Sequence, residues 1–184
     1  MVGLAAGPCG SNKNKLMTAK KKQVLILDRE SISLKVRRMA YEIWERNSDE
    51  KEITLIGIEK GGRILANNLG AILKEICKLK VETLSININK KKLLNQSVDF
   101  DHNLTGRSVI LVDDVVNSGK TILYSLNTIL VHDLKKLMVA VLVDRKHKSF
   151  PIASDIVGHS LATTLQDHIE VETSGNELVA VYLE

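Results

Sequence analysis

The sequence of 184 residues predicts an α/β fold, in which a mostly parallel sheet is covered by helices on both faces. Continuous apolar runs, typical of strands buried on both faces, alternate with segments whose apolar residues recur at helical spacing. Polar clusters also follow directly on several of these runs, at the carboxyl ends of the expected strands. Open α/β sheets bind their ligands at that edge, so we expect the functional site there.

The first part of the chain predicts two strand-and-helix units. An apolar run over 24–27 precedes a helix over 32–46, for which Ser31 is the expected N-cap. A buried strand over 53–58 then precedes a helix over 63–77. The inward face of the first helix is expected to carry Val36, Met39, Ala40, Ile43 and Trp44.

The same alternation continues to the end of the sequence. We expect strands over 81–88, 108–112 and 137–143, a helix over 121–131, and short strands with loops over 155–184. Residues 88–106 break the pattern with a long polar stretch. Because polar loops of that length are uncommon inside a compact domain, we expect a flexible loop that acts as a lid, with an ordinary solvated connection as the alternative.

Length and charge predict one domain preceded by a basic tail. Five of the 26 lysine and arginine residues lie within residues 1–22, which contain no acid, so we expect a disordered or extended tail there. Residues 23–184 are then close to neutral and long enough for one domain. A near-neutral body gives no global electrostatic footprint for nucleic acid, although a local patch stays possible.

Cysteine usage and hydropathy predict a cytoplasmic protein. Cys9 and Cys77 share no metal-ligand spacing, so we expect neither a zinc site nor a disulfide framework. No apolar run approaches the roughly 20 residues that span a bilayer, so no membrane association is expected. Aromatic residues make up only 3% of the chain, which leaves hydrogen bonds and aliphatic contacts as the main means of recognising a base.

The segment 109–121 carries the strongest chemical signal. A buried strand leads to Asp113-Asp114, then to a turn of small residues, then to Gly119-Lys-Thr121 at the start of a helix. Main-chain N–H groups at such a helix start favour a phosphate, and Gly119 permits a close approach of the backbone. Two adjacent carboxylates suit two neighbouring sugar hydroxyls, because ionised acids are acceptors only.

Two other phosphate motifs are excluded by single residues. A Walker A loop needs glycine five positions before Gly119, and that residue is Asp114. A dinucleotide fingerprint needs three spaced glycines, which the Gly61-Gly62 pair does not supply. Neither a nucleoside triphosphatase nor a Rossmann dehydrogenase is therefore supported.

This segment resembles the phosphoribosyl pyrophosphate (PRPP) motif of type I phosphoribosyltransferases. The resemblance extends over 23–184 and is nearest to the PyrR group, which combines uracil phosphoribosyltransferase activity with attenuation of pyrimidine operons; the stretch 140–152 supports this most strongly. It implies the type I phosphoribosyltransferase fold, a mostly parallel sheet flanked by helices with a small hood and a flexible loop. Hypoxanthine phosphoribosyltransferases are the second group that it resembles.

The resemblance implies a role for each matching position. Asp113 and Asp114 would be the catalytic acids on the ribose hydroxyls, and Arg145 and Thr163 would line the base pocket. No residue is expected to form a metal cage, because Mg²⁺ would be bound mainly through PRPP. The 5-phosphate would be held by Asn117, Ser118, Gly119, Lys120 and Thr121, and pyrophosphate by Glu59, Lys60, Gly61 and Gly62.

The implied activity is transfer of the phosphoribosyl group from PRPP to a nucleobase, with uracil favoured. Purine enzymes of the hypoxanthine type carry an acid where this chain has Asn117, whereas the turn 59–62 looks more like theirs than like that of PyrR. The loop contains Lys90, Lys91 and Lys92 but no arginine, which alone makes a planar bidentate grip on phosphate. A nucleotide-sensing RNA-binding regulator with little catalysis is therefore the alternative, and we expect a homo-oligomer, a dimer or larger.

Overall fold

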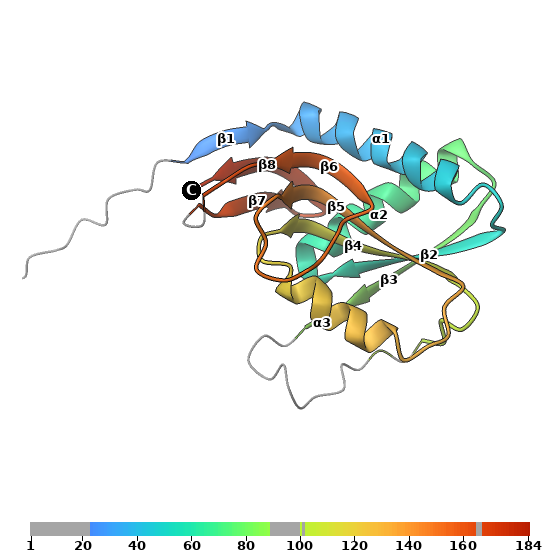
Figure 1. Cartoon of the computed structure of the whole chain (residues 1–184). Helices are drawn as coiled ribbons and strands as arrows, with labels where there is room; N and C mark the ends of the chain where they lie inside the picture. The colour runs from blue at the N-terminus through green and yellow to red at the C-terminus, as the bar shows by residue number, and fades with distance from the viewer. Residues whose placement is uncertain (1–22, 89–99, 101, 165–166) are drawn as a thin grey trace, which may run out of the picture.

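The computed structural model describes residues 23–88, 100, 102–164 and 167–184. The tail predicted over 1–22 and most of the loop predicted over 88–106 lie outside the described residues. The described part contains two sheets and the helices that cover them (Figure 1).

A five-stranded sheet with the order β3-β2-β4-β5-β6 forms the centre of the molecule. Every neighbouring pair of strands in it runs parallel, which confirms the predicted architecture. The strands are β2 (Glu52–Ile58), β3 (Lys80–Ile86), β4 (Ser108–Val116), β5 (Lys136–Arg145) and β6 (Ile156–Leu161).

Helices cover both faces of this sheet, which explains why its central strands are continuous apolar runs. The helices α1 (Arg29–Arg46) and α2 (Glu59–Ile76) lie on one face, and α3 (Lys120–Ile129) lies on the other (Figure 1). Successive strand residues point to opposite faces. One core therefore contains Leu55, Ile110 and Leu142, and the other contains Ile56, Leu111 and Val141.

A second, smaller sheet is built from strands at the two ends of the described chain. It is antiparallel, has the order β1-β8-β7, and consists of β1 (Val24–Leu27), β8 (Glu177–Leu183) and β7 (Ile169–Ser174). Leu27, Ile169 and Val181 join the same core as α1 and α2. The small sheet is thereby fixed to the large one, and β7 contacts β4.

Two predictions about the first helix are wrong. The helix begins at Arg29, and its N-cap is Asp28, whose Oδ1 accepts a hydrogen bond of 2.8 Å from the N–H of Ser31. Asp28 is the better cap because its carboxylate also interacts favourably with the positive end of the helix dipole. Trp44 is 39% exposed, whereas its neighbour Ile43 is fully buried. One residue step turns a helix by about 100°, which carries Trp44 past the edge of the buried face.

Candidate functional site

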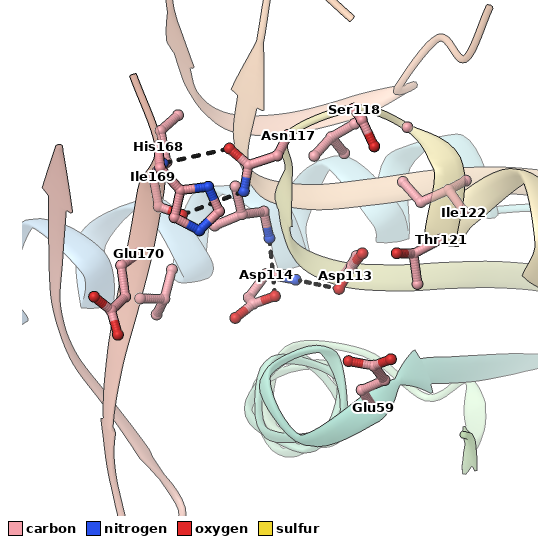
Figure 2. A pocket seen from close by; sticks show the side chains of 14 residues that line it. Glu59, Asp113, Asp114, Asn117, Ser118, Thr121, Ile122, His168, Ile169 and Glu170 are labelled. Atoms are coloured by element: carbon pink, nitrogen blue, oxygen red, sulfur yellow. Dashed lines mark hydrogen bonds between the residues drawn. The ribbon is translucent and has the colours of Figure 1, made fainter. Parts of the chain in front are cut away.

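A cleft of about 370 Å³ opens at the carboxyl ends of β2 and β4 (Figure 2). One side is formed by the end of β4 and the start of α3, and the other by β7 of the small sheet. The predicted site residues that line the cleft are Glu59, Asp113, Asp114, Asn117, Ser118, Gly119 and Thr121. The structure therefore brings together segments that lie more than 50 positions apart in the sequence.

Asp113 and Asp114 lie within the last residues of β4 rather than after it. The N–H of Asp114 donates to Oδ1 of Asp113, and the N–H of Val115 donates to Oδ1 of Asp114, each at 3.0 Å. Burial raises the pKa of Asp113 well above its usual value, and the negative charge of Asp114 adds to that effect. Burial also raises the pKa of Asp114. The pair therefore offers hydrogen-bond acceptor oxygens that are largely shielded from water.

The segment Glu59 to Gly62 forms the first turn of α2, so the helix begins earlier than the sequence predicted. Glu59 itself has a φ of 50°, the left-handed region that costs a residue with a side chain some strain. No side chain caps this helix start. Its N–H groups and the helix dipole therefore favour an anion at this position.

The glycines of this turn allow α2 to approach β4 closely. A Cβ atom on Gly61 would lie 2.0 Å from Oδ2 of Asp114, and one on Gly62 would lie 2.4 Å from the carbonyl oxygen of Val112. Neither glycine lines the cleft, and neither does Lys60. Gly61 and Gly62 thus allow the helix start to lie against the acid pair, and their predicted contact with pyrophosphate stays a prediction.

The turn before α3 provides the second helix start at the cleft. Gly119 takes a left-handed φ of 82° as the N-cap, and no side chain caps the helix. The carbonyl of Ser118 accepts a bond of 3.0 Å from the N–H of Phe150, so the segment after β5 supports the turn from behind. Lys120 is not among the lining residues, and its Nζ lies 5.8 Å from the ring centre of Tyr124.

Asn117 connects the two walls of the cleft. Its Nδ2 donates to the carbonyl of Ile169 at 3.2 Å, and its Oδ1 accepts from the N–H of Ile169 at 3.3 Å (Figure 2). The side-chain amide thus pairs with β7 as another strand would. Each of these bonds uses one of the two donor and two acceptor positions of the amide, and the predicted contact of Asn117 with phosphate stays a prediction.

Neither of the two predicted base-binding residues lines the cleft. Arg145, only 8% exposed, donates to the carbonyl of Thr164, and Thr163 is 9% exposed. The Nε of Arg145 and the Oγ1 of Thr163 have no hydrogen-bond partner within the described part of the chain. Their predicted role therefore stays a prediction.

Sequence reasoning missed one wall of the cleft. This wall consists of His168, Ile169, Glu170 and Val171, at the start of β7. The alternation of Ile169 and Val171 with polar residues does predict a half-buried strand. Only the tertiary contact between β7 and β4 shows that this strand borders the acid pair.

Among the residues that the structure describes, no three or more histidine, cysteine or acidic side chains are grouped so that they could hold a metal ion. None of the described helices has the length and apolar character needed to cross a membrane.

Comparisons with known proteins identify relatives over most of the chain. The phosphoribosyl transferase domain matches residues 23–174. The bifunctional protein PyrR of Fusobacterium nucleatum is 34% identical over 173 residues, covering 87% of this chain and 98% of the relative. PyrR of Staphylococcus carnosus is 32% identical, covering 85% of this chain and 97% of the relative.

Solved structures of purine enzymes share the fold. The hypoxanthine phosphoribosyltransferase of Trypanosoma cruzi superposes with a TM-score of 0.72 at 17% identity, covering 87% of this chain and 97% of that one. A hypoxanthine-guanine phosphoribosyltransferase of Bacillus anthracis gives a TM-score of 0.67 at 24% identity, covering 86% and 96%. At these identities the likeness shows the fold alone, and it confirms the fold class expected from the sequence.

Proposed function

This chain belongs to the phosphoribosyltransferase family, and from this premise we propose that it transfers the phosphoribosyl group of PRPP to a nucleobase, most readily uracil. The observation that carries the proposal is the meeting of the acid pair, Asp113 and Asp114, with two uncapped helix starts at one cleft. The cleft volume of about 370 Å³ lies within the range of small-molecule sites.

The two helix starts suit the two phosphate-bearing ends of PRPP. The turn from Ser118 to Thr121 would receive the 5-phosphate through main-chain N–H groups and hydroxyls. The start of α2 at Glu59 would face the pyrophosphate. Asp113 and Asp114 lie on the strand between these helix starts and would accept hydrogen bonds from the two ribose hydroxyls.

In the proposed reaction, pyrophosphate leaves C1 of the ribose while a ring nitrogen of the base attacks from the opposite face. The transition state carries positive charge on the ribose, so carboxylates that hold the hydroxyls stabilise it while fixing the ring. No covalent intermediate with the chain is needed. The buried and partly dehydrated state of the acid pair strengthens its interaction with that charge.

Magnesium fits this cleft as an ion that arrives with PRPP. The cleft presents carboxylate oxygens from Glu59, Asp113 and Asp114, and Mg²⁺ prefers oxygen ligands while keeping much of its water. When bound, the ion would neutralise charge on the departing pyrophosphate. The three acids would otherwise repel a highly charged diphosphate, so we expect PRPP to bind weakly without the metal.

Uracil is favoured over purines by the residue at position 117. Asn117 cannot exchange a proton with a base as an acid could, and its amide is held by two hydrogen bonds to Ile169. The likeness to PyrR proteins supports the same choice. The turn over 59–62 keeps hypoxanthine-type transfer as the alternative to be tested.

A panel of bases in a pyrophosphate-release assay tests the function. Purified protein with PRPP and Mg²⁺ should release pyrophosphate with uracil, and more slowly or not at all with hypoxanthine and guanine. Asp114→Asn should lower kcat/KM for PRPP by about 100-fold, because it removes a charge that stabilises the transition state. Trp44→Phe, on the exposed side of α1, is the matched control and should retain activity. Release with purines alone would overturn the choice of uracil, and no release with any base would overturn the transferase itself.

RNA-binding regulation is a second candidate, because α1 carries a cluster of basic side chains of which Lys35 and Arg38 lie near β6. Lys35, Arg37 and Arg38 lie within one turn of α1, and Arg38 reaches the carbonyl of Gly158 at 3.3 Å. The pKa of His159 on β6 is lowered, mainly by burial and also by the charge of Lys35. Filter binding to a pyrimidine-operon leader RNA, with and without UMP, tests this role; binding that neither saturates nor responds to UMP would remove it.

We also propose that the chain forms a homo-oligomer and is located in the cytoplasm. We expect a homo-oligomer in solution, which light scattering of the purified chain checks directly. A monomer at micromolar concentration would contradict it. A cytoplasmic location is checked by fractionating cells that express the tagged chain.

A further inference from the structure

We propose that His168 contacts the nucleobase and helps to decide which base is accepted. The proposal rests on the transferase function proposed above. Of the described residues that line the cleft, His168 alone has an aromatic ring. It lies on the wall formed by β7, on the opposite side from Ser118 and Thr121 (Figure 2).

The place of His168 follows from the shape of a ribose 5-phosphate. The 5-phosphate and the base leave the ring from carbon atoms on opposite sides of the ring oxygen. When the phosphate lies at the turn before α3 and the hydroxyls lie on Asp113 and Asp114, C1 is directed away from that turn. The wall that remains on that side of the cleft is the start of β7, where His168 stands.

The main chain around His168 is held by two pairs of hydrogen bonds. Its N–H donates to the carbonyl of Glu184 at 3.0 Å, and its carbonyl accepts from the N–H of Glu184 at 2.9 Å. The next residue, Ile169, is held on both sides by the amide of Asn117, at 3.2 and 3.3 Å. The imidazole therefore extends from a fixed backbone, and little ordering of that backbone opposes binding.

Neighbouring side chains leave His168 as the group on this wall suited to a base. Ile169 is 2% exposed, and Val171 is aliphatic, so neither supplies a polar contact. Glu170, when ionised, only accepts hydrogen bonds, so it suits a ring N–H of uracil but neither of its carbonyl oxygens. The imidazole provides a flat face for stacking and an N–H that can donate to a carbonyl oxygen. Uracil has two such carbonyl oxygens.

The test compares two ligands that differ only in the base. Titration calorimetry of the full chain with UMP and with ribose 5-phosphate measures the contribution of the base directly. We expect His168→Ala to weaken UMP binding by about 10-fold, a typical effect of losing one base contact, and to change ribose 5-phosphate binding by less than about twofold. In the base-transfer assay, KM for the base should rise while KM for PRPP stays the same.

Two further variants complete the experiment. His132→Ala removes a histidine just beyond the opposite end of α3 and should bind both ligands as the unchanged chain does. His168→Phe keeps the flat face but loses the N–H. If it binds UMP normally, the contact is made by stacking, and if it binds like His168→Ala, the contact is a hydrogen bond.

The outcomes separate this proposal from the proposed function. If the unchanged chain binds neither UMP nor ribose 5-phosphate, the transferase function fails and His168 has no base to contact. If it binds both, and His168→Ala weakens both equally or neither, the function stands and the role of His168 is wrong. Only selective loss of UMP affinity supports the proposal.

Discussion

At the scale of single residues, Asp113 shows the conflict between stability and function. Its side chain is buried at 8% exposure beside a second acid, and its pKa is raised well above the usual 3.8. The folded state therefore disfavours the carboxylate form. The free energy of unfolding therefore falls as the pH rises from the pKa of Asp113 in the unfolded chain through its raised pKa in the folded chain. The cleft retains a group that weakens the fold near neutral pH.

We therefore expect Asp113→Asn to raise Tm near pH 7 while it lowers transferase activity. Asparagine removes the buried charge and keeps an oxygen that accepts from the N–H of Asp114. In a domain of this size, each 1 kcal/mol raises Tm by about 2–4 °C. Thermal melts at pH 7 and near pH 4 provide the check, because the gain should shrink at the lower pH. A variant less stable than the unchanged chain at pH 7 would contradict this account.

The sequence predicted which residues form the site better than it predicted which residues they contact. Asp113, Asp114 and the turn to Thr121 were found because their chemistry is local to one segment. The partners of Asn117 were not, because Ile169 lies 52 positions away and contributes only main-chain atoms. The burial of Arg145 escaped prediction for the same reason, since its bond reaches the carbonyl of Thr164.

At the scale of elements, the contact between α2 and β4 depends on Gly61 having no side chain. The start of α2 rests against the acid pair at Gly61, where a Cβ atom would lie 2.0 Å from Oδ2 of Asp114. Close packing of this kind leaves no room for even a methyl group without movement. The position of the helix start and that of the acid are therefore set together.

Gly61→Ala should abolish most PRPP binding by displacing Asp114 or the start of α2. The loss is expected to exceed 10-fold in affinity, because small misplacements of this kind are costly at a reacting centre. Gly70→Ala on the same helix is the control, since the nearest atom to its Cβ would be the Thr83 hydroxyl at 3.0 Å, and no atom of the acid pair is among its neighbours. Calorimetric titration with PRPP and Mg²⁺ measures both. Equal affinities for the two variants would show that the close contact is unimportant.

The link between β4 and β7 through Asn117 is also testable. Asn117→Ala removes both hydrogen bonds to Ile169, so hydrogen exchange at the amide of Ile169 should become faster by about 10-fold. Asn117→Asp keeps the acceptor and loses the donor, so its exchange rate should lie between the two. Mass spectrometry of peptides over 167–174 measures this. Unchanged protection in Asn117→Ala would mean that β8 alone holds β7.

The strands and helices of the large sheet were predictable because each has its own pattern of apolar residues. The strands over 108–112 and 137–143 were placed within the observed β4 and β5, although both strands extend further. The helix ends were less accurate: α2 starts at Glu59 because the left-handed φ of that residue turns the chain directly into the helix. The small sheet needs the pairing of β1 with β8, which no local pattern indicates.

At the scale of the whole molecule, the two sheets share one hydrophobic core. Leu27 of β1 and Val181 of β8 pack in the same cluster as Met39 of α1 and Leu65 of α2. Separate cores would allow the small sheet to unfold alone. A shared core leads us to expect that the described chain unfolds as one cooperative unit, and the single domain expected over 23–184 stays a prediction.

Val181→Ala should lower the stability of the whole molecule rather than that of the small sheet alone. Val181 is fully buried, so the truncation should cost about 2 kcal/mol, or about 4–8 °C in Tm. The fluorescence of Trp44, the single tryptophan of the chain, reports on α1, while far-UV circular dichroism reports on all helices and strands together. The two curves should coincide. A separate early transition in circular dichroism would show that the small sheet unfolds independently.

The pairing of β1 with β8 also has a consequence for biosynthesis. Val24 lies opposite Leu183, so β1 cannot find its partner until β8 has been synthesised. Contacts between such distant positions form slowly, because a long stretch of chain must first be brought together. All strands of the large sheet have been synthesised once the ribosome has passed Leu161. The wall that carries His168 is completed only after β8 emerges from the ribosome. A nascent chain would thus acquire its acid pair before it acquires the wall opposite.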